Sequence, residues 1–358
     1  MRDEPTDIRV GEELAVDAIR VFLEKHIELP SEPLVAKQFP GGHSNLTYQI
    51  SAGELDLVLR RPPLGTYVKS GHDMGREYRV LQGLARIGAR VPKPVAYCDD
   101  ESAIGAPFYV MERVQGTIVR GSRPPSGVSY SADQMRALSE AFVDNLVSIH
   151  ATDLDASGLR ELGQPDGYVK RQVEGWSRRY KRAQTDQMSD MESVSEWLLH
   201  HLPESSPGTL IHNDYKYDNL VVNPSQLSDI RAVLDWEMAT VGDPFMDLGT
   251  SLGYWSQADD PEPMRASPFP PTYLPGNFTR RELVARYEEK TGRSVAHVVF
   301  YYAYALFKIA VICQQIYKRF ADGQSKDPRF GRLIFAVALL SQTASRAIEL
   351  DRIDRLHA

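Results

Sequence analysis

The sequence has little of what would indicate a disulfide-bonded, zinc-binding or nucleic-acid-binding protein. Its 358 residues include two cysteines, Cys98 and Cys313, which lie far apart and lack C-x-x-C spacing. We therefore expect neither a disulfide framework nor a structural zinc site. The same scarcity of cysteine predicts a reducing, cytoplasmic location. Positive charge is also in deficit, since 41 Lys and Arg face 48 Asp and Glu, for a net charge of −7. This balance argues against a nucleic-acid partner that is held through its phosphates.

The sequence also lacks a stretch that predicts a membrane anchor or an export signal. Residues 1–5 are polar and acidic, without the apolar core of a signal peptide. The most apolar later stretch, about 295–316, is interrupted by Lys308 and rich in Tyr, so it predicts a buried helix and no membrane partner. There is no internal repeat. A chain of 358 residues exceeds the usual size of one domain, so we expect two lobes.

What the sequence does contain is a run of polar residues between two apolar stretches. Residues 211–222 read IHNDYKYDNLVV, which gives the spacing H-x-D-x-K-x-x-N to His212, Asp214, Lys216 and Asn219. In the catalytic loop of kinases, the Asp of this pattern accepts the proton of the substrate hydroxyl and the Asn holds a magnesium ion. The simpler alternative is a polar loop in which Asp and Asn are turn residues. The Lys and a second acidic motif downstream favour the kinase interpretation.

The second motif, residues 232–237 (AVLDWE), is a strand-like run that ends in Asp235. A transferring phosphoryl group spreads negative charge over its oxygens, so its catalysis depends on positioning and charge stabilisation. We therefore predict Asp214 as the catalytic residue that faces the acceptor hydroxyl and Lys216 as a catalytic charge that reaches the phosphate. Asn219 and Asp235 are the predicted Mg²⁺ ligands, because this hard cation prefers oxygen and keeps several waters.

The first part of the chain predicts an antiparallel sheet. A helix is expected at 11–27, followed by strands near 34–39, 46–50 and 55–60. The first hairpin contains residues 41–45 (GGHSN), whose backbone N–H groups could lie over phosphates, although a Gly-Gly hairpin can also be only a turn. The predicted nucleotide-binding residues of this hairpin are Gly42, His43, Ser44 and Asn45.

Two more elements are expected to bind the nucleotide. A predicted helix at 73–87 carries Glu77, and kinases pair such a Glu with a strand Lys that holds the phosphates. Here the strand ends in Arg60, which can pair with carboxylate and phosphate but differs in geometry from Lys. Glu77 could also be a solvated helix charge. The strand that ends near Glu112 and Val114 would bind the adenine of the nucleotide through the backbone of these residues. The alternative is that it is a plain core strand.

The rest of the sequence predicts mainly helices. Capping boxes at Ser131–Gln134 and Thr279–Glu282 each open a helix. The basic helix at 166–183 is either solvated or flanks an acidic substrate, and residues 256–277 form a long loop. Asp243 is either a helix cap or a site residue. Further helices are expected at 189–202, 296–321 and 330–354.

Together these motifs resemble the aminoglycoside phosphotransferase / choline kinase-like family, a branch of the protein-kinase-like fold. The likeness is nearest to the kinase-like domain found fused to acyl-CoA dehydrogenases, and it spans about 34–320. A dehydrogenase label on this chain would come from those fused relatives, since its length leaves no room for a second enzyme. The resemblance rests on the runs at 41–48, 57–63, 72–78, 108–112, 212–219, 234–237 and 242–248.

The resemblance implies an α+β fold of two lobes. Residues 1–33 would be a helical N-terminal extension. Residues 34–114 would form a small nucleotide-binding lobe with an antiparallel sheet and one helix. Residues 115–358 would form a larger, mainly helical lobe with the catalytic loop and the substrate site.

The function implied by the resemblance is transfer of the γ-phosphate of ATP, with Mg²⁺, to a hydroxyl of a small molecule. Asp214 would be the base, Arg60 would hold phosphates with Glu77 positioning it, and Asp247 would hold the catalytic loop from the start of a helix. The family pattern has Lys where this chain has Arg60, which leaves the nucleotide affinity open. The alternative is a nucleotide-binding pseudokinase with a regulatory or scaffolding role, although the intact Asp214, Asn219 and Asp235 favour the enzyme.

Overall fold

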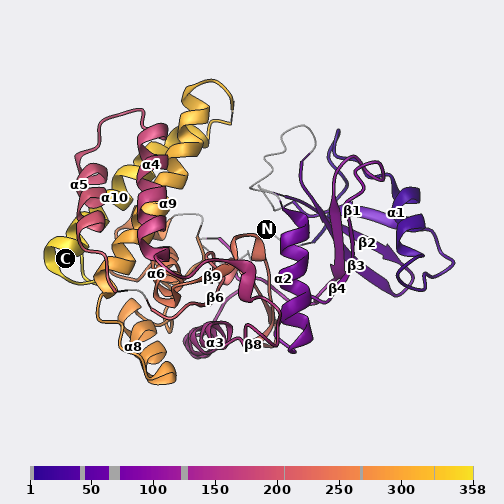
Figure 1. Cartoon of the computed structure of the whole chain (residues 1–358), viewed down its shortest axis with the longest axis horizontal. Helices are drawn as coiled ribbons and strands as arrows, with labels where there is room; N and C mark the ends of the chain where they lie inside the picture. The colour runs from indigo at the N-terminus through magenta and orange to yellow at the C-terminus, as the bar shows by residue number, and fades with distance from the viewer. Residues whose placement is uncertain are drawn as a thin grey trace. The chain divides into compact units, whose positions relative to one another are not determined.

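The computed structural model describes residues 4–40, 45–63, 73–121, 128–204, 206–266, 269–325 and 327–357. The chain forms two compact units, which we call the N-unit and the C-unit (Figure 1). The N-unit comprises Met1–Ile118, Asp153–Leu159 and Asn219–Ala239, and the C-unit comprises Val119–Thr152, Arg160–Asp218 and Thr240–Ala358.

The N-unit is built on a five-stranded antiparallel sheet with the strand order β1-β2-β3-β5-β4. Between β2 and β3 the chain turns at Gly53, whose φ of +53° favours glycine. The register of β2 and β3 places Thr47 opposite Arg60. This confirms the predicted antiparallel sheet. The strands are β1 (Val35–Gln38), β2 (Leu46–Ala52), β3 (Leu55–Arg61), β4 (Pro94–Cys98) and β5 (Phe108–Glu112).

Two helices, α1 (Val16–Leu23) and α2 (Met74–Arg86), lie on opposite sides of this sheet (Figure 1). Helix α1 is shorter than the predicted 11–27, and it buries Ile19 and Leu23 in the hydrophobic core of the sheet. Helix α2 begins where predicted, because the side chain of Asp73 accepts a hydrogen bond from the backbone N–H of Arg76 at 2.8 Å. The sheet and its capped helix thus place Glu77 in the first turn of α2.

The segment that follows the catalytic loop belongs to the N-unit. Strands β7 (Leu220–Asn223) and β8 (Gln226–Val233) pair in an antiparallel hairpin, and a 3₁₀ turn at Trp236–Met238 follows. Val222 exchanges two backbone hydrogen bonds with Thr117, of 2.9 and 2.8 Å. Both predicted metal ligands therefore lie in the N-unit, whereas the predicted base lies in the C-unit.

The C-unit is mainly helical, with one short sheet of β6 (Thr209–Ile211) and β9 (Thr240–Gly242). Both predicted capping boxes are present, at the starts of α3 and α8. The predicted loop at 256–277 contains a short helix, α7. The helices are α3 (Ala132–His150), α4 (Tyr168–Ala183), α5 (Ser189–His200), α6 (Pro244–Tyr254), α7 (Glu262–Arg265), α8 (Arg280–Thr291), α9 (Val298–Ala321) and α10 (Leu333–Leu350), with 3₁₀ turns at Arg160–Leu162, Tyr217–Asn219 and Phe330–Arg332.

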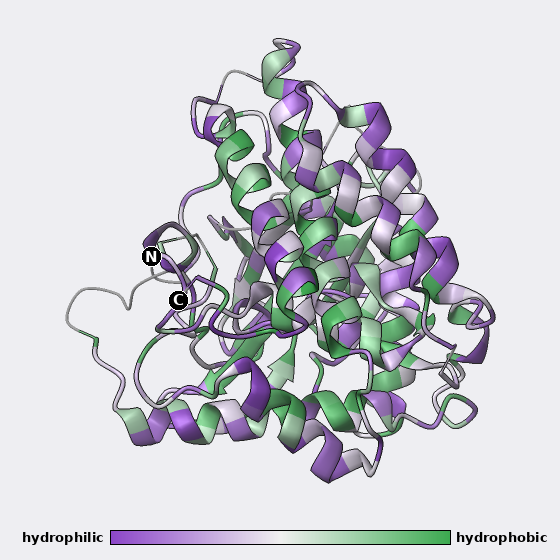
Figure 2. Ribbon diagram, turned by 90° about the vertical axis from the view of Figure 1, so that its left-hand side faces the viewer, coloured by the Kyte–Doolittle hydropathy of each residue, from purple (hydrophilic) through white to green (hydrophobic). Residues whose placement is uncertain are grey.

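Helix α9 forms the centre of the C-unit, and all of its residues from 299 to 311 are buried. A Cβ atom added at Gly249 of α6 would lie 2.6 Å from the carbonyl oxygen of Tyr301, so α6 and α9 pack at close backbone distance. Residues 298–321 and 330–350 are each long and apolar enough to cross a membrane, and the apolar windows are 78% and 33% buried. The first is the buried helix that the sequence predicts. Figure 2 shows how hydrophobic and hydrophilic residues alternate along the helices.

Candidate active site

In the C-unit, Asp247 holds the catalytic loop from the first turn of α6. Its side chain is fully buried. One carboxylate oxygen accepts the backbone N–H of His212 and the other accepts the backbone N–H of Asn213, both at 2.7 Å. Asp243 is the N-cap of the same helix, because it accepts the N–H of Phe245 at 2.8 Å. Asp247 therefore has the role that the resemblance implies, and Asp243 is a cap.

His150, at the end of α3, completes the surroundings of Asp247. Its Nε2 lies 3.2 Å from the carboxylate of Asp247 and its Nδ1 lies 2.8 Å from the hydroxyl of Tyr287. Burial alone would raise the pKa of Asp247, but the hydrogen bond with His150 and the N–H of His212 lower it further than burial raises it. The carboxylate that anchors the loop is therefore ionised at neutral pH.

The residue before the predicted base, Asn213, has a left-handed backbone with φ of 66°. Asn tolerates this conformation better than most residues. Its side-chain oxygen accepts a hydrogen bond from Tyr168 at 3.2 Å, and its carbonyl accepts one from Lys308 at 2.9 Å. The backbone N–H of Asp214 donates to Nδ1 of His212 at 3.2 Å, which requires that this nitrogen carries no proton. The loop is thus held by bonds on both sides of Asp214.

The carboxylate of Asp214 is 17% exposed and contacts Lys216, whose ammonium lies 2.9 and 2.7 Å from its two oxygens. The same ammonium lies 4.6 Å from the ring centroid of Tyr254. Burial raises the pKa of Tyr254, and its hydrogen bond to Asp214 raises it further. We predicted the phosphate as the partner of Lys216; the structure pairs it with Asp214, because the opposite charges face each other in a site with little solvent.

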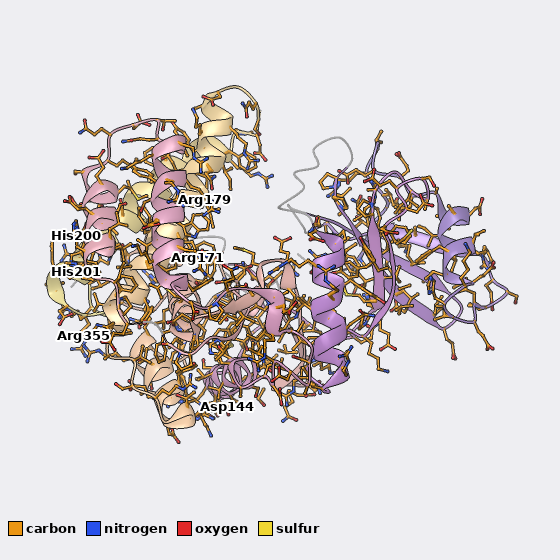
Figure 3. All side chains as sticks on the ribbon, in the orientation of Figure 1. Asp144, Arg171, Arg179, His200, His201 and Arg355 are labelled. Carbon is orange, nitrogen blue, oxygen red and sulfur yellow. The ribbon has the colours of Figure 1, made fainter. Side chains whose placement is uncertain are left out.

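Other cations of the C-unit lie on α9 and α4. Lys308 of α9 is 2% exposed. Figure 3 labels Arg171 and Arg179 along α4, and the guanidinium of Arg179 lies 4.6 Å from the ring centroid of Trp176. The charges of Arg179 and Lys216 act on Lys308, as does the carboxylate of Asp214. The sequence indicated the basic character of α4 but not that Lys308 would join it.

In the N-unit, the structure brings Arg60 and Glu77 together as predicted. The two side chains form an ion pair at 2.7 Å, and they are 11% and 1% exposed. A second nitrogen of the same guanidinium lies 3.2 Å from the carboxylate of Asp235. The planar fork of Arg can hold two carboxylates in this way, whereas the ammonium of Lys is a point charge. Arg60 therefore links the helix α2 to a predicted metal ligand.

The pKa values of both members of this ion pair are raised, which favours the charged form of Arg60 and the neutral form of Glu77. Burial would lower the pKa of Arg60, but the carboxylates of Glu77 and Asp235 raise it well above its usual range. Burial raises the pKa of Glu77 and Arg60 opposes that rise. We regard the pair as ionised at neutral pH, because a guanidinium keeps its proton in proteins and lies at hydrogen-bond distance from the carboxylate.

The predicted metal ligands Asn219 and Asp235 lie on neighbouring segments. The backbone N–H of Leu234 donates to the carbonyl of Asn219 at 2.8 Å, and Asp235 follows with a left-handed φ of 66°. Asn219 is buried and Asp235 is half-exposed. In the part of the chain that the structure describes, no group of three His, Cys, Asp or Glu could hold a metal ion. One amide and one carboxylate still suit Mg²⁺, which takes its other oxygens from phosphates and water.

The predicted phosphate-binding hairpin lies mostly outside the described residues, which exclude Gly42, His43 and Ser44. Its last member, Asn45, is buried and donates from its side chain to the carboxylate of Glu237 at 2.9 Å. The sequence reasoning did not assign Glu237, although it stands in the same AVLDWE motif as Asp235. The contact ties the strand β2 to the metal-ligand segment within the N-unit.

The predicted adenine-binding residues lie at the end of strand β5 and just beyond it. Glu112 ends β5, and its backbone N–H donates to the carbonyl of Lys93 at 2.9 Å. The side chain of Glu112 forms an exposed ion pair with Lys93 at 3.6 Å. Val114 lies two residues beyond the strand and is half-buried. These contacts are those of a core strand, and the binding of adenine by Glu112 and Val114 stays a prediction.

Comparison with known proteins agrees with this geometry. Residues 35–267 match the model of the phosphotransferase enzyme family. Acyl-CoA dehydrogenase family member 10 of Mus musculus is 36% identical over 312 residues, which are 86% of this chain but 29% of that protein. The chain thus spans less than a third of that relative.

Two solved structures are similar along nearly the whole chain. A "putative aminoglycoside phosphotransferase" from Ralstonia eutropha has a TM-score of 0.78 and 30% identity, with 93% of this chain and 99% of that chain covered. A thermostable aminoglycoside phosphotransferase mutant, in a ternary complex with AMP-PNP and hygromycin B, has a TM-score of 0.57 and 15% identity, with coverages of 92% and 98%. The second likeness shows the fold alone. The α+β kinase-like fold is therefore confirmed, and the chain belongs to the phosphotransferase enzyme family.

Proposed function

We propose that the chain transfers the γ-phosphate of ATP to a hydroxyl of a small molecule. The observation that carries this proposal is the catalytic loop of the C-unit, where a buried Asp247 and two neighbouring side chains fix the backbone around Asp214. A carboxylate on a fixed backbone, partly open to solvent, suits a base that must meet a hydroxyl in one geometry. The family membership supports the same chemistry.

In this proposal Asp214 accepts the proton of the acceptor hydroxyl as that oxygen attacks the γ-phosphorus. A catalytic base of this kind contributes about 10² to 10⁴ in rate. The carboxylate now bonds Lys216, so the hydroxyl must share it with the ammonium or displace it. Lys216 then has its positive charge beside the reacting phosphate, which is the role that the sequence predicted for it.

The nucleotide would be held by the N-unit. Asn219 and Asp235 provide the hard oxygen donors that fit Mg²⁺, which would neutralise the phosphate charge when bound. The guanidinium of Arg60 has five N–H donors and uses two nitrogens on Glu77 and Asp235. Its remaining donors would contact phosphate, as predicted for the residue in the Lys position. The resemblance to an AMP-PNP complex supports ATP as the donor.

The charges around Asp214 bear on the acceptor. Lys308, Lys216 and Arg179 give that part of the C-unit a positive character. Of the acidic residues in the 256–277 loop, Asp260 is buried in an ion pair with Arg280 and cannot meet a cationic ligand. We therefore propose a neutral or acidic hydroxylated molecule as the acceptor, because a polycationic aminoglycoside would meet repulsion here.

The test is a screen of hydroxylated metabolites, including sugars, aminoglycosides and hydroxyacyl thioesters, with the purified chain, ATP and Mg²⁺. We expect ADP formation that depends on one acceptor class and on Mg²⁺, with the phosphorylated acceptor detected by mass spectrometry. Hydrolysis of ATP without an acceptor is the background control. Binding of ATP without transfer to any acceptor would contradict the proposal.

One alternative rests on a specific observation. The two carboxylates that phosphotransfer requires each have a cationic partner in the structure, Lys216 on Asp214 and Arg60 on Asp235. In a nucleotide-binding pseudokinase with a regulatory or scaffolding role, these two ion pairs would not have to open, because the carboxylates would take no part in a reaction. Calorimetry separates the two functions, since a pseudokinase would bind nucleotide with no acceptor-dependent turnover. The small-molecule partner and the cytoplasmic location stay predictions.

A further inference from the structure

Lys308 is a buried cation that has no part in the proposed transfer step itself. It stands in the middle of α9, is 2% exposed, and lies 95 positions along the chain from its bonded partner. Its ammonium has three donors, and the one hydrogen bond found for it among the described residues goes to the carbonyl of Asn213 at 2.9 Å. A lysine is rarely placed in such a site unless its charge has a use.

The carbonyl that Lys308 bonds belongs to the peptide unit just before the base. At the other end of this peptide unit, the N–H of Asp214 donates to Nδ1 of His212 at 3.2 Å. The peptide plane between Asn213 and Asp214 is therefore fixed by one bond at its oxygen and one at its nitrogen. Without the bond to its oxygen, the plane could turn, and the carboxylate of Asp214 would turn with it.

The strained backbone of Asn213 makes this bond more important. Its φ of 66° lies in the left-handed region, which a non-glycine residue occupies at a cost. Asp247 holds the N–H of Asn213 and Tyr168 holds its side chain, so these two bonds do not restrain its carbonyl. Lys308 does restrain that carbonyl, because its ammonium donates a hydrogen bond to it at 2.9 Å.

The position of Lys308 disfavours its own charge. Burial lowers its pKa to about 8, in spite of the carboxylates of Asp214 and Asp247, and the cations Lys216 and Arg179 lower it further. These four groups come from the catalytic loop, α6 and α4, which surround this part of α9. An uncharged side chain of similar shape would avoid the cost of burial. A residue that costs stability at a buried position often serves function.

We propose that Lys308 is a positioning residue for the base: its ammonium fixes the Asn213–Asp214 peptide plane and thereby the direction of the Asp214 carboxylate. This inference rests on the proposed phosphotransfer. It adds a group from a distant helix that the sequence motifs do not contain. The bond predicts an effect on the chemical step and none on nucleotide binding, because its acceptor, Asn213, is not among the predicted nucleotide ligands.

The test compares Lys308→Met, which keeps the length of the side chain but removes the ammonium, with Lys308→Gln, which keeps a donor without the charge. Lys318→Met on the same helix is the matched control, since Lys318 is a half-exposed cation that pairs with Asp322 of the following turn. We expect Lys308→Met to lower kcat by roughly 10- to 100-fold, the effect of a misplaced reacting group, with the Kd of ATP changed less than about twofold. The kcat of Lys308→Gln should fall less than that of Lys308→Met, and the kcat of Lys318→Met should equal that of the wild type.

Two further readouts separate positioning from a structural role. The melting temperature of Lys308→Met should equal or exceed that of the wild type, because the cost of burying the ammonium is gone. The kcat of the wild type should also decline above about pH 8, by no more than Lys308→Gln loses, because the neutral amine keeps N–H donors but loses its charge; this decline should be absent in Lys308→Met.

Each outcome decides between the two proposals. If the wild type transfers phosphate and Lys308→Met keeps its kcat, the role of Lys308 is overturned while the proposed function stands. If kcat falls only in proportion to a lower folded fraction, Lys308 is a structural brace and the positioning role is wrong. If the wild type transfers phosphate to no acceptor, the proposed function fails and the role of Lys308 fails with it.

Discussion

Replacing Glu77 by Gln tests the buried ion pair that the N-unit places at its predicted nucleotide site. The substitution keeps the size of the side chain and removes its charge. Arg60, 11% exposed, would then keep one partner, the carboxylate of Asp235 at 3.2 Å. We expect a large loss of stability, because a buried guanidinium without its nearest carboxylate is poorly compensated.

The magnitude follows from the burial of the pair. Removal of one partner of a buried ion pair costs about 3–5 kcal/mol in the free energy of unfolding. Asp235 still attracts Arg60, so we expect the lower end of this range, about 3 kcal/mol. With a typical dependence of about 1–3 kcal/mol per M urea, the unfolding midpoint should fall by about 1 M or more. The double variant Arg60→Met/Glu77→Leu should recover most of this loss, since both fully buried charges are gone and Asp235, which loses Arg60, is 34% exposed to solvent.

The assay is urea unfolding followed by circular dichroism, with Lys93→Gln as the control. Lys93 forms an exposed ion pair with Glu112 in the same unit, at 3.6 Å with side chains 73% and 53% exposed. Loss of such a pair should cost less than about 1 kcal/mol. If Glu77→Gln lowers the free energy of unfolding no more than Lys93→Gln does, the Arg60–Glu77 pair is not desolvated. Our description of the N-unit would then be wrong.

Three other outcomes follow from the structure. Gly249→Ala should lower the free energy of unfolding by about 1–3 kcal/mol in thermal melts, because its Cβ would lie 2.6 Å from the carbonyl oxygen of Tyr301; an unchanged melt would contradict the close packing of α6 on α9. Asp235→Ala should abolish Mg²⁺-dependent ATP binding in calorimetry and keep the fold, and an unchanged affinity would exclude it as a metal ligand. The protonated, buried Lys308 costs stability fully below pH 8, and this cost disappears as pH rises toward 10.5. The stability advantage of Lys308→Met over the wild type should therefore shrink by about 3 kcal/mol over that range, and an advantage independent of pH would contradict the lowered pKa.

Local signals in the sequence predicted most helices and strands. The capping boxes at Ser131–Gln134 and Thr279–Glu282 work through neighbouring residues, so they could be recognised without any tertiary structure. The pairing of Arg60 with Glu77 was predicted from the kinase pattern, since a strand and a helix in fixed order bring these residues together.

Contacts between distant segments were not predictable from such signals. Lys308 bonds Asn213 only because α9 crosses the catalytic loop, and no local pattern encodes that crossing. The segment 219–239 folds with the N-unit, and Val222 in it exchanges backbone hydrogen bonds with Thr117. A prediction that divides the sequence into two lobes at one position cannot assign such a returning segment to the first lobe. Lys216 was assigned by its spacing, but its partner depends on which opposite charge the fold brings nearest to it.

The most direct test of the central claim is the effect of Asp214→Asn on ATP binding and on phosphotransfer, measured on the same variant. Asparagine keeps the size of the side chain but loses the basicity. We predict that the Kd of ATP stays within a few-fold of the wild type, while turnover with the acceptor falls by at least about 100-fold. Turnover close to that of the wild type would contradict the assignment of Asp214 as the base.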